Sequence, residues 1–151
     1  MQHFQGIKHI NAIPMQSVAS NATATSNVID TLGFSELEIC VFRETHTSGT
    51  FSTLTIQQSD DTVATNFGTV TGLVAGTDYT VADAIPGTSS AVTNISFVAN
   101  VDLRGKKRYF RLLVTPSVAS AYVSAHALLG KGAVSAADSA AGVAELVNQP
   151  D

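Results

Sequence analysis

The stretch of sequence that decides the fold is residues 102–115, DLRGKKRYFRLLVT. Its second half carries an apolar side chain at every second position: Phe110, Leu112 and Val114. Successive side chains of a β-strand point to opposite faces, so these three share one face. We therefore predict a strand with one buried face over residues 108–115. The charged first half, residues 102–107, is predicted to be a turn.

The same period of two recurs along most of the chain. Strands with one apolar face are predicted over residues 34–42, 51–58, 95–101 and 122–129. Shorter β segments are predicted over residues 18–25, 68–74 and 79–82. The short connections predict two hairpins, one joining 34–42 to 51–58 and the other joining 95–101 to 108–115.

These segments predict the fold class and the domain organisation. Seven or eight short strands at this spacing are typical of an all-β, antiparallel β-sandwich of jelly-roll type, and 151 residues suit a single core. Residues 1–14 lack a regular period, and residues 131–151 are rich in Ala, Ser and Gly. We expect an N-terminal arm (1–16), a sandwich domain (17–130) and a C-terminal arm (131–151), both arms being irregular.

Composition and charge argue against several classes of partner. The net charge of −4 does not favour a dedicated nucleic-acid-binding protein, which is normally basic. The most apolar stretch, residues 118–129, is shorter than the roughly 20 residues that span a bilayer. No signal-peptide core is evident near the N-terminus. We expect neither nucleic acid nor a membrane as a partner.

No set of residues predicts catalysis, a metal or a cofactor. The sequence lacks the motifs of nucleophilic, metal-dependent or phosphate-binding sites. Asp60 and Asp61 could offer oxygen ligands to an ion, but a turn is the better interpretation, since Asp is favoured there. Cys40 is expected to be a packed strand residue, and His3 and His9 to belong to the arm. His126 is expected to be a surface or interface residue, and we expect no enzyme.

One concentration of charge stands out as a candidate protein interface. Five of the eight basic residues fall within eight positions, and four of them form the candidate site: Arg104, Lys106, Lys107 and Arg108. A local positive patch could dock onto an acidic partner surface. Equally, Lys and Arg could keep an exposed hairpin edge soluble. Nucleic-acid binding is a weaker third interpretation, in which Tyr109 and Phe110 would stack on bases.

Five short segments along the chain carry a resemblance to a known family. They are Asp30-Thr31-Leu32-Gly33-Phe34, Glu36-Leu37-Glu38-Ile39, Gln58-Ser59-Asp60-Asp61, Lys107-Arg108-Tyr109-Phe110-Arg111 and Ala127-Leu128-Leu129-Gly130. In this order they resemble small β-sandwich virion proteins of tailed bacteriophages. The resemblance covers about residues 17–130. Many relatives end shortly after the Leu-Gly word, whereas this chain continues for about twenty residues.

The resemblance implies a capsid decoration, or cement, protein. Such a protein sits on the outer surface of the virion, commonly as a homotrimer, and holds neighbouring copies of the major capsid protein together. Assembly would take place in the host cytoplasm. The alternative from another class is a carbohydrate- or receptor-binding β-sandwich module of a tail or surface structure, which would normally present exposed aromatic side chains.

Overall fold

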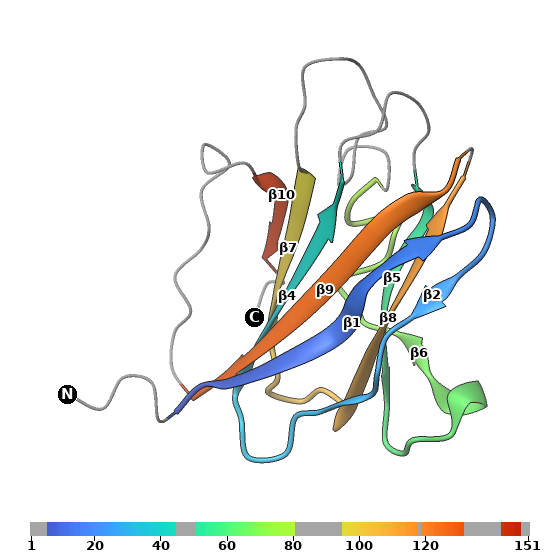
Figure 1. Ribbon diagram of the computed structural model, residues 1–151. Coiled ribbons are helices and arrows are strands. Elements are labelled where there is room, and N and C mark those ends of the chain that lie inside the picture. Colours follow the sequence, from blue (N-terminus) through green and yellow to red (C-terminus); the bar gives the residue numbers. More distant parts are fainter. Residues whose placement is uncertain (1–5, 45–50, 81–94, 118, 132–142, 149–151) are drawn as a thin grey trace.

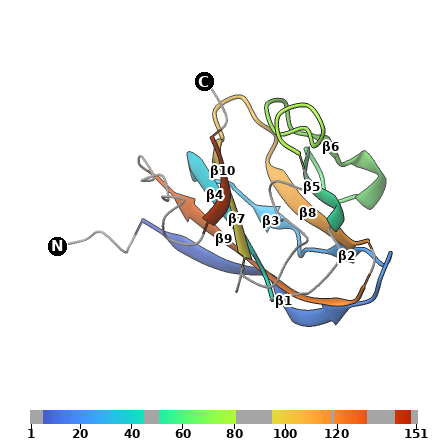
Figure 2. The same cartoon turned by 90° about the horizontal axis from the view of Figure 1, so that it is seen from above.

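A computed structural model describes residues 6–44, 51–80, 95–117, 119–131 and 143–148, which form a two-layered β-sandwich (Figure 1). The first sheet has the strand order β1-β9-β4-β7-β10 and the second the order β2-β8-β5-β6, with β3 also pairing with β8. Figure 2 shows the two layers from above. The strands of the first sheet are β1 (Lys8–Val18), β4 (Glu36–Arg43), β7 (Ile95–Asp102), β9 (Ala121–Gly130) and β10 (Val143–Asn148). Those of the second are β2 (Ala24–Thr25), β3 (Ile29–Asp30), β5 (Phe51–Ser59), β6 (Gly68–Thr69) and β8 (Tyr109–Pro116).

The prediction of an all-β sandwich is confirmed. Within the described residues, seven strands have six or more residues and three have only two. Neighbouring strands pair antiparallel, except that β10 runs parallel to β7. A single 3-10 turn, Ala64–Asn66, is the only helical segment described. No described helix is therefore long and apolar enough to span a bilayer.

The core lies between the sheets and follows the period of two that the sequence displays. On β8, Phe110, Leu112 and Val114 are fully buried, as predicted. On β9, the buried side chains of one face include Val123, Ala125 and Ala127. Tyr79 closes part of the core, because its ring packs 5.5 Å from the Phe97 ring and its hydroxyl donates a 2.6 Å hydrogen bond to the Leu54 carbonyl.

Both predicted hairpins are wrong. β4 belongs to the first sheet and β5 to the second, and β7 and β8 are divided in the same way. β4 pairs with β7 and β9, whereas β5 pairs with β6 and β8. Alternation of apolar and polar residues shows only that a strand has one buried face. Two consecutive strands show the same alternation whether they pair as a hairpin or lie in opposite sheets.

The predicted N-terminal arm is wrong for residues 8–16, which belong to the edge strand β1 and pair with β9. The register of this pair shifts twice, between Asn11 and Ile13 and between Ile13 and Gln16. A bulge of this kind disrupts the period of two, so the sequence does not display the strand. Pro14 lies in the shifted stretch and is tolerated on an edge strand.

The prediction of an irregular C-terminal arm is wrong for residues 143–148, which form β10 against β7. Residues 18–25 are not one strand, since the chain turns between β1 and β2 at Asn21, whose φ is 60°. Of residues 68–74 only β6 is a strand. Tyr79 forms one isolated bridge with Ala75, and residues 81–82 lie outside the described residues.

Two adjacent leucines on β8 test the packing. Leu112 is fully buried between the sheets, whereas Leu113 is half-buried and points to the other face. Leu112→Ala should lower the free energy of unfolding by about 2–5 kcal/mol, because it leaves a cavity in a closed core. Leu113→Ala, the matched control, should cost less than about 1.5 kcal/mol. Urea unfolding measures both, and equal losses would contradict this packing.

Candidate protein interface

Three turns meet at one end of the sandwich, the lower end in Figure 1, and contain all four candidate interface residues. They comprise residues 30–35, 59–63 and 102–108, here called the basal end. The strand register brings them together, because Tyr109 at the start of β8 pairs with Asp30 on one side and with Ser59 on the other. Each turn continues a paired strand, so its first residues have fixed positions.

Arg104 and Lys106 lie on a tight turn that is held by contacts among its own residues. The Arg104 backbone N–H donates to Asp102 Oδ1 at 2.9 Å, and the Arg104 guanidinium pairs with Asp102 Oδ2. The Lys106 N–H then donates to the Leu103 carbonyl at 3.1 Å. Gly105 has φ of 72°, a conformation that costs little only without a side chain. The turn therefore presents Lys106 in a defined position.

Arg108 joins this turn to the turn that follows β3. Its Nε and Nη2 donate to Asp30 Oδ1 and Oδ2 at 2.8 and 2.7 Å, a two-pronged arrangement that fixes both side chains. The Arg108 carbonyl accepts hydrogen bonds from the backbone N–H and the hydroxyl of Thr31. Its guanidinium also lies 4.8 Å from the centre of the Tyr109 ring. Arg108 is thereby held on three sides.

This pair changes the acid–base properties of Asp30. The hydrogen bond from Arg108, together with one from the Leu32 N–H, lowers the pKa of Asp30 from 3.8 to about 2, although partial burial opposes the shift. The same contact raises the pKa of Arg108. Asp30 is thus ionised throughout the neutral range, and the pair persists there.

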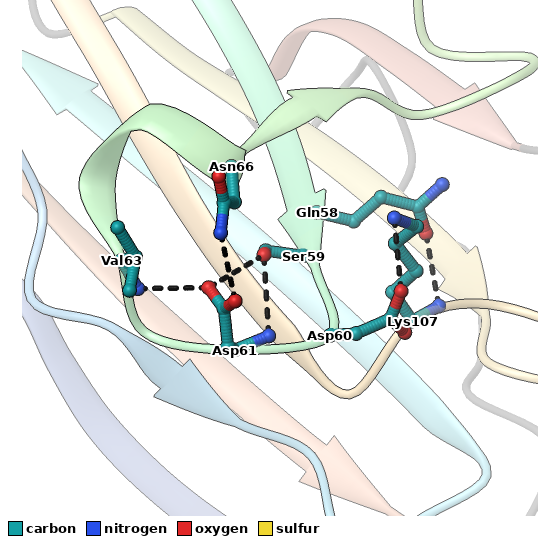
Figure 3. Close-up of polar contacts among 7 residues, drawn as sticks. All are labelled: Gln58, Ser59, Asp60, Asp61, Val63, Asn66 and Lys107. Atoms are coloured by element: carbon teal, nitrogen blue, oxygen red, sulfur yellow. Dashed lines mark hydrogen bonds and ion pairs between the residues drawn. The ribbon is translucent and has the colours of Figure 1, made fainter.

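Lys107 joins the turn to the end of β5. Its ammonium lies 3.0 Å from Asp60 Oδ2, and its backbone N–H donates to Gln58 Oε1 at 3.1 Å (Figure 3). Both groups of this ion pair are largely exposed, so water and salt screen their attraction. The backbone contact to Gln58 is independent of charge and holds the turn beside β5.

Asp60 and Asp61 form a turn, as predicted. Figure 3 shows Asp60 pointing to Lys107, whereas Asp61 points back into its own turn. Asp61 accepts hydrogen bonds from the Val63 N–H at 2.9 Å, the Asn66 amide at 2.8 Å and the Ser59 hydroxyl at 3.4 Å. These donors, with Asn66 foremost, lower the pKa of Asp61. In the described part of the chain, no three His, Cys, Asp or Glu residues gather as metal ligands would.

The four candidate residues lie close together in the structure, but three of them each form an ion pair with one carboxylate. Arg104, Lys107 and Arg108 each pair with an aspartate. Among the described residues, Lys106 alone of the four has no ion pair, and it is half-buried. The positive excess is therefore smaller than the sequence suggested. Whether this end contacts a partner stays a prediction.

Two of the partners escaped the sequence analysis because they are distant along the chain. Asp30 lies 78 residues from Arg108, and Gln58, whose amide oxygen accepts from the Lys107 N–H, lies 49 residues from Lys107. No local pattern marks such pairs, and only the pairing of β8 with both β3 and β5 brings them together. Two apolar side chains on these turns, Leu32 and Val63, were also missed, being 67% and 53% exposed.

The other reactive side chains do not form a site with these residues. Burial, reinforced by Glu38, raises the pKa of Cys40 to about 12, which keeps the thiol protonated and unreactive. His126 is exposed on β9, with its ring 6.1 Å from that of Phe42. His9 is exposed on β1 and is therefore part of the sheet, whereas His3 lies outside the described residues.

No protein-family model matches the sequence, and no curated protein matches it. Among solved structures, the chain is similar to a chain in the structure of infectious bursal disease virus, Gx strain, with a TM-score of 0.50 and 14% sequence identity. The match covers 83% of this chain and 32% of the viral chain, so the present chain spans about a third of that neighbour. At this identity the likeness shows the fold alone. The resemblance to phage virion proteins stays a prediction.

The pair between Asp30 and Arg108 predicts how stability responds to acid. A carboxyl group whose pKa is lower in the folded than in the unfolded chain stabilises the fold at any pH above its unfolded pKa. This stabilisation is lost as the pH falls through the folded pKa. For Asp30, the loss should occur between about pH 4 and about pH 2. The melting temperature of the wild type should fall more steeply across this range than that of Asp30→Asn. Thermal unfolding followed by circular dichroism measures this, and parallel slopes would show that the pair contributes nothing.

Proposed function

We propose that this chain is a structural virion protein that acts by binding, without turnover. It would bind the outer surface of a bacteriophage capsid and stabilise it by bridging neighbouring copies of the major capsid protein. Copies of the chain would themselves associate, with a trimer as the favoured state. The segments that resemble phage decoration proteins motivate this proposal, and the sandwich that resembles part of a chain in a virus structure supports it.

The observation that carries the proposal is the rigidity of the basal end. Backbone and side-chain contacts hold the turn of residues 102–108 to both neighbouring turns before any partner binds. A surface ordered in advance loses less conformational entropy on binding, which favours affinity. Exposed Leu32 and Val63 on the adjoining turns would add apolar contact area. A lattice of many copies would then multiply modest individual affinities.

Charge reversal at Lys106 tests the basal end as the binding surface. Lys106 has no ion pair within the described residues, so Lys106→Glu removes a cation without breaking a contact of the fold. It should weaken binding to particles that lack this protein by about tenfold at low salt, and by less at high salt. Co-sedimentation with the particles measures the affinity.

Two further variants complete this experiment. Lys107→Glu should weaken binding at least as much, since it also places like charges beside Asp60. Ser120→Glu, which adds negative charge to the exposed turn between β8 and β9 at the opposite end, is the control and should bind normally. Wild-type protein should raise the temperature at which the particles break open. Unchanged binding of both lysine variants would mean that the basal charges serve only solubility.

Carbohydrate or receptor binding is the second candidate, because one observation favours it. Phe42 and Tyr122 are 43% and 51% exposed, on adjacent strands of the first sheet. Exposed aromatic rings are a common feature of sugar-binding surfaces. A glycan array with the wild type tests this, and specific binding that Tyr122→Ala abolishes would establish sugar binding at this face of the sheet.

A further inference from the structure

Arg111 is the fifth basic residue of the charge cluster, and it does not lie on the basal end. It belongs to β8, where its neighbours Phe110 and Leu112 are fully buried between the sheets. Because successive side chains of a strand alternate, Arg111 points to the outer face of the second sheet. Gln57 lies directly opposite it on β5. Arg111 therefore faces a different surface from the basal turns.

Two contacts hold the Arg111 guanidinium in place. Its Nε donates a 2.7 Å hydrogen bond to Gln57 Oε1, and its central carbon lies 4.4 Å from the centre of the Phe67 ring. Phe67 is only 8% exposed, so the ring is a fixed support. A side chain that is ordered before a partner arrives loses less conformational entropy on binding. The guanidinium is thus positioned in advance.

The outer edge of the Arg111 guanidinium is unoccupied. Within the described residues, Arg111 forms no ion pair, and its Nη1 and Nη2 donate no hydrogen bond. Neither nitrogen is among the buried polar atoms of these residues that lack a hydrogen-bond partner, so both are open to solvent. Arg104 and Arg108 differ in this respect, because each pairs with an aspartate. Most N–H donors of Arg111 are therefore available to a ligand.

The surroundings of Arg111 on this face are neutral. Tyr109 and Leu113 lie two positions before and after it on β8 and therefore share its face. Asp30 lies opposite Tyr109, but its carboxylate is paired with Arg108. Arg111 is thus a single cation, and no ion pair within the described residues neutralises it.

We propose that Arg111 is a binding site for a carboxylate of a protein partner, namely an Asp or Glu side chain. The two Nη atoms present the planar fork of donors that matches the two oxygens of a carboxylate. Arginine is also enriched among the residues that dominate binding energy at protein interfaces. Thr25 and Thr55 lie opposite Leu113 on either side and would offer hydroxyl groups to the same partner.

The surroundings favour a protein carboxylate over a sugar or a nucleic acid. Sugar-binding surfaces commonly present open aromatic rings, but an arginine guanidinium already lies over the Phe67 ring and another over the Tyr109 ring. A nucleic-acid backbone is a row of phosphates that several cations neutralise together. Arg111 has neutral neighbours on its face, so one carboxylate matches it better than such a row.

An NMR titration of the full ¹⁵N-labelled chain with hexaglutamate peptide at low salt tests the proposal. The Arg111 Nε–H signal and the backbone amide signals of Gln57 and Leu113 should shift. The dissociation constant should be about 1 mM, since a single ion pair at a surface is weak. Hexaglutamine peptide, which lacks the carboxylates, should cause no shift.

Three variants separate the fork of donors from charge alone. Arg111→Gln should raise the dissociation constant at least about tenfold. Arg111→Lys should raise it at least about fivefold, because an ammonium keeps the charge but cannot form the fork. Gln57→Glu should raise it at least about tenfold, because the new carboxylate would pair with Arg111 in place of the peptide.

Lys131→Gln is the matched control. It removes one positive charge from an exposed residue just after β9, so it changes the net charge as Arg111→Gln does. Its dissociation constant should stay within about twofold of the wild type. The NMR spectrum of each variant shows whether it is folded, and the nearly isosteric Gln57→Glu keeps the test decisive if Arg111→Gln does not fold.

Four results would overturn the proposal. They are the absence of any shift, shifts confined to residues 102–108, wild-type affinity of Arg111→Lys, and a hexathymidine oligonucleotide that shifts the same signals at lower concentration than hexaglutamate. None of these measurements uses a viral particle. Failure here therefore leaves the basal-end proposal standing, and failure of capsid binding leaves this one standing.

Discussion

The structure depends on one packing constraint, namely that the inner faces of two sheets must bury each other. β8 is the centre of the second sheet and pairs with β2, β3 and β5. Its inward side chains are fully buried, so a change there disturbs the whole core. The same strand fixes the basal end, because its first residue lies between Asp30 and Ser59. Core packing and the geometry of the candidate interface therefore have a common origin.

This arrangement separates two surfaces with different chemistry. At the basal end, three basic residues pair with aspartates of their own or of neighbouring turns, which fixes the turns and leaves little net charge. On the outer face of the first sheet, the rings of Phe42 and His126 contact each other, and Phe42 and Tyr122 are exposed. Because the two surfaces occupy different elements, substitutions in one should leave the other intact.

The sequence predicted the elements better than their arrangement. Alternation on residues 34–42, 108–115 and 122–129 correctly indicated strands with one buried face, since burial on one face requires that pattern. It could not say which sheet each strand joins, and both hairpins were therefore wrong. β1 was missed because its bulges break the period. The four basic residues were grouped correctly, but the pairing of Arg108 with Asp30, 78 residues away, depends on long-range strand pairing that no local pattern shows.

The central claim is that this chain binds the outer surface of a capsid through its basal end. An electron-microscopy map of the intact particle tests it most directly, because head, neck and tail proteins share sandwich folds and the fold alone does not fix the position. The account predicts density for the sandwich on the outside of the head, with residues 102–108 facing the capsid shell. Density for this chain at the neck or tail, or a basal end turned to solvent, would contradict it.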